Sequence, residues 1–272
     1  MWHLRKYLEQ KKNKDILIHF LNDILTFKEK CPIQEVTFLK PSQDPEIASK
    51  KTSIVDILCK DEKGSSYIVE MQVAKTKGFE KTAQYYASKA YSSQADVGDE
   101  YHDLKEIIFL AIADYIMFPS KQEYKSDHVI LDKKTYQHDL KDFSFTFIEL
   151  PKFNKEVGEL THIQEKWCYF FKHAEETSQE DLQKIIGEDG IIKRAYTELD
   201  RFGWSEAELL TYEQSEKQRK DYQSSLNQKF DEGRVEGITS TARGLLKAGV
   251  SVSIIQAATG LTKEEIESLQ DK

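Results

Sequence analysis

Three polar residues interrupt two short apolar stretches of the chain. Asp56 lies within Ile54-Val-Asp-Ile-Leu58, and Glu70 and Gln72 lie within Tyr67-Ile-Val-Glu-Met-Gln-Val73. If both stretches are strands, the two-residue period of a strand places Glu70 and Gln72 on one face, roughly 6–7 Å apart. An antiparallel pairing of the two strands can bring Asp56 to the same face, although the register stays open at this level.

Two carboxylates on one apolar sheet face point to a particular chemistry. They repel each other and lose hydration unless a cation lies between them, and hard oxygen ligands of this kind favour Mg²⁺ or Mn²⁺. A cation held there would polarise a phosphodiester and lower the pKa of an attacking water. The alternative is that Asp56 and Glu70 are ordinary strand acids, solvated or paired with lysine.

The elements that would position these residues follow from the hydrophobic pattern. The turn Asp61-Glu-Lys-Gly64 joins the two stretches into a hairpin, and Gly64 stands where a left-handed residue is favoured. The strand with the apolar run Ile107–Ala113 is expected to be central in a sheet. Further elements are predicted as strands over 35–39, 105–118, 127–131 and 143–150, and as helices over 13–29, 78–94 and most of the chain after 155.

Composition limits the class of protein. The 272 residues, 39% hydrophobic and 32% charged, suit one large domain or one domain with an appendage. The apolar runs are too short for a membrane span, and polar residues break the N-terminal stretch where a signal peptide would lie. Cys31, Cys59 and Cys168 have neither disulfide nor zinc spacing and fit a reducing cytoplasm.

The net charge of −8 means that a nucleic-acid partner must be bound through a local basic patch or through metal ions. The segment 72–90 has a local charge of +3, from four lysines less Glu80. It follows the second strand of the hairpin directly, so it could bind the phosphates of a nucleic acid. A solvated helix face is an equally good interpretation. The four candidate DNA-binding residues are Lys75, Lys77, Lys81 and Lys89. Tyr85, Tyr86 and Tyr91 in the same segment are interpreted as core residues rather than as stacking platforms for bases.

The C-terminal part has a different character. Residues 205–231 form a charged helix with few apolar anchors, which is typical of a solvated strut or an oligomerisation helix. Three short helices are predicted behind it, over 239–248, 251–258 and 262–269. Residues 236–272 have a net charge of −1, four basic against five acidic, so a contact with protein is favoured over strong duplex binding.

Several motifs extend beyond the hairpin and appear in a defined order. Asp56, the Gly64 turn and Glu70-Met71-Gln72 resemble the active-site hairpin of the PD-(D/E)XK nucleases, in particular the branch of recombination-promoting nucleases and transposases. The resemblance covers about residues 10–170. The segments that share it are Asn13–Leu25, Tyr67–Gln72, Tyr85–Lys89, Gln94…Gly98…Tyr101 and Ile148–Phe153.

The resemblance implies a fold, an activity and roles for single residues. The fold would be α/β, a restriction-endonuclease-like mixed sheet flanked by helices, with an all-helical C-terminal extension. The activity would be Mg²⁺- or Mn²⁺-dependent hydrolysis of phosphodiester bonds in DNA. Asp56 and Glu70 would be the metal ligands, the Met71 carbonyl a third ligand, and Gln72 would stand where the motif usually has lysine. A glutamine amide has no charge and little basicity, so it would hold water or a phosphate oxygen by hydrogen bonds.

The chain departs from the family at its start. Met1-Trp-His-Leu-Arg-Lys-Tyr-Leu-Glu9 lacks the leading acid that usually precedes the first helix, and Glu9, Asp15 and Asp23 are the possible substitutes. Two alternatives to an active endonuclease therefore stay open. One is a catalytically degenerate transposase relic, and the other is a helix-turn-helix module that binds DNA or protein.

The resulting domain prediction has three parts. Residues 1–175 form the nuclease-like core, residues 176–235 a helical extension, and residues 236–272 a small helix-turn-helix-like module of three helices. The expected partners are DNA and a second copy of the chain, joined through the C-terminal helices. No membrane partner is expected, and the expected location is cytoplasmic.

Overall fold

The computed structural model describes residues 8, 10–25, 32–40, 42–43, 53–95, 100–173, 176–186, 190–199 and 206–269. The chain divides into two compact units, Met1–Ser205 and Glu206–Lys272. Apolar clusters fill the interior of each unit separately. The three-part division expected from the sequence stays a prediction.

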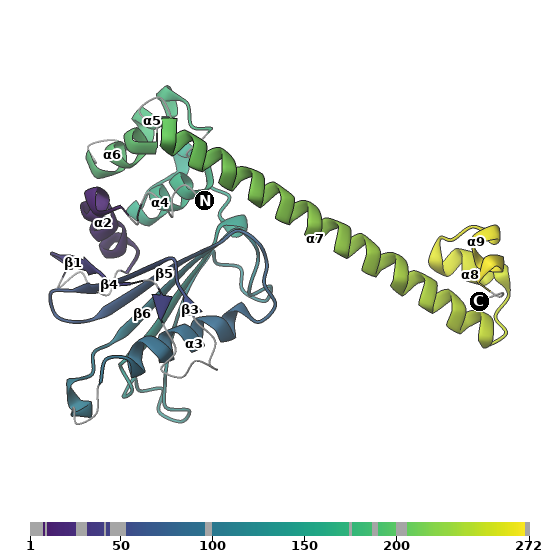
Figure 1. Cartoon of the computed structure of the whole chain (residues 1–272). Coiled ribbons are helices and arrows are strands. Elements are labelled where there is room, and N and C mark those ends of the chain that lie inside the picture. Colours follow the sequence, from purple (N-terminus) through teal and green to yellow (C-terminus); the bar gives the residue numbers. More distant parts are fainter. Residues whose placement is uncertain are drawn as a thin grey trace. The chain divides into compact units, whose positions relative to one another are not determined.

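A six-stranded mixed sheet forms the centre of the first unit (Figure 1). Its order is β1-β4-β5-β6-β8-β7, in which β5, β6 and β8 run parallel and the remaining pairs are antiparallel. The strands are β1 (Val36–Phe38), β4 (Ile57–Asp61), β5 (Ser66–Gln72), β6 (Ile107–Ala113), β7 (Lys125–Val129) and β8 (Phe143–Glu149). A separate two-stranded sheet consists of β2 (Ser42–Gln43) and β3 (Ser53–Ile54).

Helices cover both faces of this sheet (Figure 1). The helix α3 (Phe79–Ser92) packs on one face. On the other face lie α2 (Lys14–Ile24) and α4 (Ile163–His173). The helix α6 (Gly190–Leu199) packs on both of these helices, and α5 (Gln179–Ile186) packs on α6. All seven residues of β6 are buried, because a central parallel strand with helices on both sides of the sheet has no solvent-exposed face.

Alternation along the strands assigns each side chain to a layer. Ile107, Phe109 and Ala111 of β6 belong to the apolar cluster under α3, and the residues between them belong to the cluster under the other helices. In β5, Ile68 lies in the α3 cluster and Val69 in the other. The two-residue period therefore places Glu70 and Gln72 on the α3 face.

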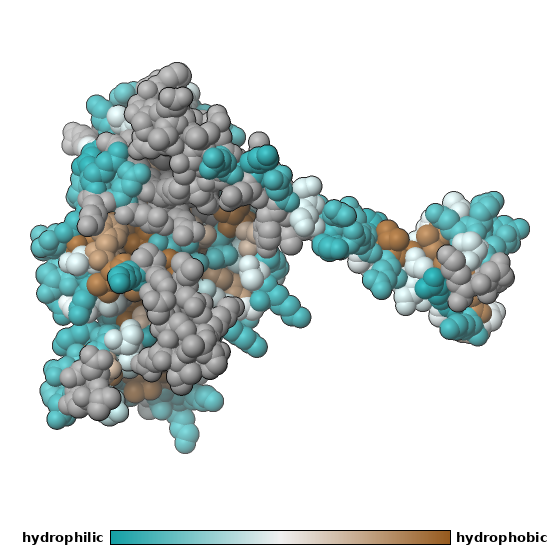
Figure 2. All heavy atoms as spheres, in the orientation of Figure 1, coloured by the Kyte–Doolittle hydropathy of each residue, from teal (hydrophilic) through white to brown (hydrophobic). Residues whose placement is uncertain are grey.

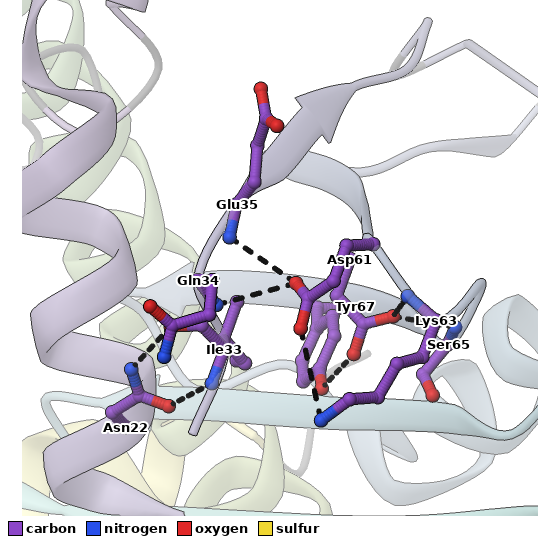
Figure 3. A network of polar contacts seen from close by, with 9 residues as sticks. Asn22, Ile33, Gln34, Glu35, Asp61, Lys63, Ser65 and Tyr67 are labelled. Carbon is purple, nitrogen blue, oxygen red and sulfur yellow. Dashed lines mark hydrogen bonds and ion pairs between the residues drawn. The ribbon is translucent and has the colours of Figure 1, made fainter. Parts of the chain in front are cut away.

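A polar network closes the turn of the β4–β5 hairpin (Figure 3). Asp61 Oδ1 accepts hydrogen bonds from the backbone amides of Lys63 and Ser65, both at 2.9 Å, and its Oδ2 accepts one from the Tyr67 hydroxyl at 2.9 Å. Gly64 adopts a φ of +94°, the left-handed conformation expected from its place in the turn. The same network reaches the N-terminal region, where Asn22 of α2 exchanges two hydrogen bonds with the Ile33 backbone.

The second unit is a long helix with a small cluster of helices at its end. The helix α7 (Glu206–Lys247) is followed by α8 (Val252–Thr259) and α9 (Lys263–Ser268). Ala242, Ile255 and Ile266 form the buried centre of the cluster. Figure 2 shows a mainly hydrophilic surface on this unit with scattered apolar residues. Phe230 and Val235 of α7 are exposed.

Most predicted elements are confirmed, and several differ in extent. The strand expected over 105–118 is only Ile107–Ala113, and the strand expected over 127–131 is Lys125–Val129. The hairpin, the central strand and the helix after Gly78 are present. The prediction that one helix ends near Asp231 and another begins at Thr239 is wrong, because α7 continues through both. The interval contains glycines but no proline, and a glycine costs a helix only about 1 kcal/mol. The helix expected over 13–29 is also shorter, because α2 ends at Ile24 and Leu25 is its C-cap. Among the helices that the structure describes, none combines the length and the apolar character of a membrane span.

Candidate active site

The two hairpin carboxylates lie side by side at the open end of β4 and β5. Ile57 pairs with Val69 in the antiparallel register, which places Asp56 opposite Glu70. The Asp56 amide donates a hydrogen bond to Glu70 Oε2 at 3.0 Å, and the Met71 amide donates one to Asp56 Oδ2 at 2.8 Å. Each acid therefore accepts a bond from the backbone of the opposite strand, which fixes both carboxylates between the two strands.

Gln72 extends this arrangement along the same face. Its Nε2 donates a hydrogen bond to Glu70 Oε1 at 3.0 Å. Glu70 thus receives a donor on each of its carboxylate oxygens. Asp56 and Glu70 are each 6% exposed, whereas Gln72 is half-buried.

Tyr86 of α3 lies near the two acids, which its sequence position did not indicate. Its pKa is raised by burial first, and then by the nearby charges of Glu70 and Asp56. The side chain packs against the apolar cluster under α3. The helical spacing of Phe79, Ala83, Ala87 and Ala90 could have placed Tyr86 at the border of the buried face, but only the packing of α3 on the sheet brings it to the carboxylates.

The donor set of the site fits a hard divalent cation. Two adjacent, buried carboxylates supply the oxygen ligands that Mg²⁺ and Mn²⁺ prefer. Within the part of the chain that the structure describes, no three His, Cys, Asp or Glu residues gather into a metal-binding group. The remaining ligands would accordingly be water, substrate oxygens or a backbone carbonyl, and the assignment of the Met71 carbonyl stays a prediction.

The comparison with protein families decides the relationship. A family model described as PD-(D/E)XK nuclease family transposase matches residues 2–229. The chain belongs to this family. The match is longer than the resemblance read from the motifs, and it includes the start of the chain and part of α7. Searches of curated proteins and of solved structures gave no significant match.

Membership in this family identifies the fold class of the sheet and its helices. The mixed six-stranded sheet with flanking helices is a restriction-endonuclease-like α/β fold. A nuclease- or transposase-type function goes with the family, as does DNA as the substrate, and nucleases of this kind generally use divalent metals.

The acids considered as replacements for the missing N-terminal carboxylate have other contacts. Asp15 forms an ion pair with Arg194 of α6. Asp23 accepts a hydrogen bond from Trp167 Nε1 of α4 at 2.7 Å. Both therefore tie the helical layer together, and Glu9 lies outside the described residues.

The four candidate DNA-binding lysines follow the site along the chain. Lys75 and Lys77 are exposed in the loop between β5 and α3. Lys81, Tyr85 and Lys89 follow one another at intervals of four residues along α3, so the three side chains lie on one side of the helix. Tyr85 is 45% exposed, and Tyr91 donates a hydrogen bond to Asp142 at 2.6 Å. Tyr91 is thus a structural residue, as expected, whereas Tyr85 is not part of the core.

Proposed function

We propose that the chain is a DNA endonuclease that hydrolyses phosphodiester bonds with Mg²⁺ or Mn²⁺ held by Asp56 and Glu70. The observation that supports this best is the pair of hydrogen bonds between the acids and the opposite strands of the hairpin. This arrangement holds two negative charges together at a buried position, which favours a cation between them. The proposal agrees with the nuclease and transposase character of the family.

The residues around the acids would bind the water, the reacting phosphate and the DNA backbone. When bound, the cation would polarise the phosphodiester and lower the pKa of an attacking water. Gln72 holds Glu70 through its amide nitrogen, and its amide oxygen can accept a hydrogen bond from that water. Tyr86 lies near the two acids, and its hydroxyl can donate a hydrogen bond to a phosphate oxygen. Lys75, Lys77, Lys81 and Lys89 would bind the phosphates of the DNA backbone.

Plasmid cleavage with and without Mg²⁺ tests the proposal. The informative pair of variants is Glu70→Gln, at the site, and Glu62→Gln, at the other end of the same hairpin. Glu62 accepts hydrogen bonds from the Gln34 and Glu35 amides, and a glutamine oxygen can still accept them. We expect metal-dependent cleavage by the wild type and by Glu62→Gln, and none by Glu70→Gln.

The alternatives correspond to other outcomes of the same experiment. Stabilisation of the wild type by Mg²⁺ without cleavage would indicate a degenerate transposase relic. Neither stabilisation nor cleavage would favour the helix-turn-helix module, in which α8 and α9 bind DNA or protein.

We also propose that copies of the chain associate through the C-terminal helices. The support is the length of α7, which has 42 residues. Long single helices of this kind usually gain their stability from packing against another helix. Phe230 and Val235, both exposed on α7, are the apolar side chains that such packing would cover.

A further inference from the structure

A buried ion pair lies at the end of β8, outside the group of residues described above. The Glu149 carboxylate and the Lys152 ammonium are 2.6 Å apart, and their side chains are only 1% and 8% exposed. Glu149 is the last residue of β8, and the short helix η4 (Leu150–Lys152) returns Lys152 to it. Neither residue was a candidate in the sequence, because Glu-x-x-Lys spacing is also common on solvated surfaces.

Both charges of the pair hold the same short segment. Glu149 Oε1 accepts hydrogen bonds from the backbone amides of Met117 and Phe118, at 2.5 and 2.9 Å. Lys152 Nζ donates to the Phe118 carbonyl at 2.9 Å. The carboxylate therefore binds the N–H groups and the ammonium binds a C=O group of residues 117–118, a clamp that a single side chain could not make.

The clamped segment begins beside the candidate active site. It leaves β6 at Asp114, whose amide donates a hydrogen bond to the Gln72 carbonyl at 2.8 Å. Gln72, Ala113 and Glu149 are partners in successive strands and form one row across the sheet. Neighbouring strands lie about 4.8 Å apart, so Glu149 is about 10 Å from Gln72 with only the Ala113 methyl between them.

The segment also lies next to the lysine-bearing loop that follows Gln72. Tyr115, which belongs to the segment, is half-buried, and burial is the main cause that raises its pKa. The Thr76 backbone opposes this rise, and the carboxylates of Glu80 and Glu149 add to it. Tyr115 is thus close to the loop between β5 and α3 and to the clamp.

A buried ion pair is weak evidence for stability, because the cost of desolvating two charges offsets most of their attraction. What such a pair does supply is a defined geometry for the groups it binds. We propose that Glu149 and Lys152 are positioning residues for the nuclease reaction. By clamping residues 117–118 they hold the 114–118 segment against Gln72 and the loop of Lys75 and Lys77. This inference rests on the proposed function.

The test replaces both charges together, so that no unpaired charge stays buried. In the full-length chain, Glu149→Gln/Lys152→Met keeps the volume of the two side chains and removes the ion pair. The matched control is Glu165→Gln/Lys155→Met. Glu165 is likewise buried, forms an ion pair with Lys155 at 2.5 Å, and accepts hydrogen bonds from the Thr161 and His162 amides. That pair anchors the start of α4, away from β5.

Steady-state cleavage separates positioning from stability. We expect the Glu149/Lys152 double variant to lose kcat on the order of 10²-fold, the usual effect of misplacing a reacting group. Its calorimetric affinity for Mg²⁺ should stay the same, because Asp56 and Glu70 are untouched, whereas its KM for DNA should rise, because the loop of Lys75 and Lys77 is no longer held. The Glu165/Lys155 double variant should keep its kcat. Equal kcat values for the wild type and the Glu149/Lys152 variant would overturn the inference, as would equal losses in both double variants.

Amide hydrogen exchange of the wild type keeps the inference testable if the variant does not fold. The amides of Asp114, Met117 and Phe118 should exchange as slowly as those of β6, since all three donate hydrogen bonds at or near buried groups. Exchange at the rate of an open loop would overturn the clamp. An inactive wild type would overturn the proposed function and the positioning role together, whereas an active wild type with an unaffected double variant would overturn the positioning role alone.

Discussion

The β4–β5 hairpin buries acids at both of its ends, and the two ends use them differently. At the turn, Asp61 accepts three hydrogen bonds from residues at most six positions away in the sequence. At the open end, Asp56 and Glu70 are fourteen residues apart, and each accepts a hydrogen bond from the strand that carries the other. A local cluster of donors stabilises the single acid at the turn. The open end instead holds two like charges together, which folding alone does not require.

The contrast teaches how to separate structural from functional acids in this chain. The buried acids Asp61 and Glu165 receive several backbone amides, a hydroxyl or a lysine. The pKa of Glu165 shows the effect. Burial alone would raise it, but the hydrogen bonds of Lys155 and of the Thr161 and His162 amides lower it to about 2. Among the strands that the structure describes, two such acids face each other only at the open end of the hairpin.

The largest effect is expected from Asp56→Asn. The asparagine oxygen can still accept the Met71 amide, so the fold should be kept while the Mg²⁺ affinity measured by calorimetry falls sharply. The metal-free variant should also have a higher free energy of unfolding than the metal-free wild type, because the repulsion between the two acids is relieved. An unchanged Mg²⁺ affinity would contradict the assignment of Asp56 as a ligand.

Gln72 offers the next largest effect. Gln72→Ala should slow cleavage on the order of 10²-fold, the typical result of losing a positioning hydrogen bond, without abolishing metal binding. Gln72→Lys should retain activity, with some loss of metal affinity because the ammonium would pair with the carboxylates. Cleavage by Gln72→Ala at the wild-type rate would reduce Gln72 to an ordinary strand residue.

At the turn end, a change should affect stability and not metal binding. Asp61→Ala leaves the buried Tyr67 hydroxyl and two amides without their acceptor, so the free energy of unfolding should fall by about 1–3 kcal/mol. Adding Tyr67→Phe should recover part of this loss, since the orphaned hydroxyl is removed. Denaturant titration measures both effects. A loss of Mg²⁺ affinity in Asp61→Ala would show that the two ends are not independent.

The smallest effect at the hairpin is expected from removing the second unit. Both ends of the hairpin lie within Met1–Ser205, so a chain ending at Ser205 should unfold cooperatively and bind Mg²⁺ as before. Its mass in solution should be that of a monomer if the C-terminal helices join two copies, which light scattering can measure. An insoluble or molten product would show that the second unit supports the core.

Much of the fold follows from the sequence because its signals are local. The apolar run Ile107–Ala113 predicted a central strand, and Asp61 and Gly64 specify a turn by their own side-chain and backbone preferences. The motif residues Asp56, Glu70 and Gln72 could be named for the same reason, since strand period and residue type are visible in the chain. The continuity of α7 was missed because single glycines weaken a helix without ending it.

Tertiary structure decided what lies next to what. The register of β4 and β5 set Asp56 opposite Glu70, and a shift of one residue would have sent it to the other face. The packing of α3 brought Tyr86 to the acids, and the parallel pairing of β6 with β5 and β8 aligned Gln72, Ala113 and Glu149 in one row. These contacts join residues far apart in the chain, and their energies depend on burial and distance, which residue types and spacing alone do not contain.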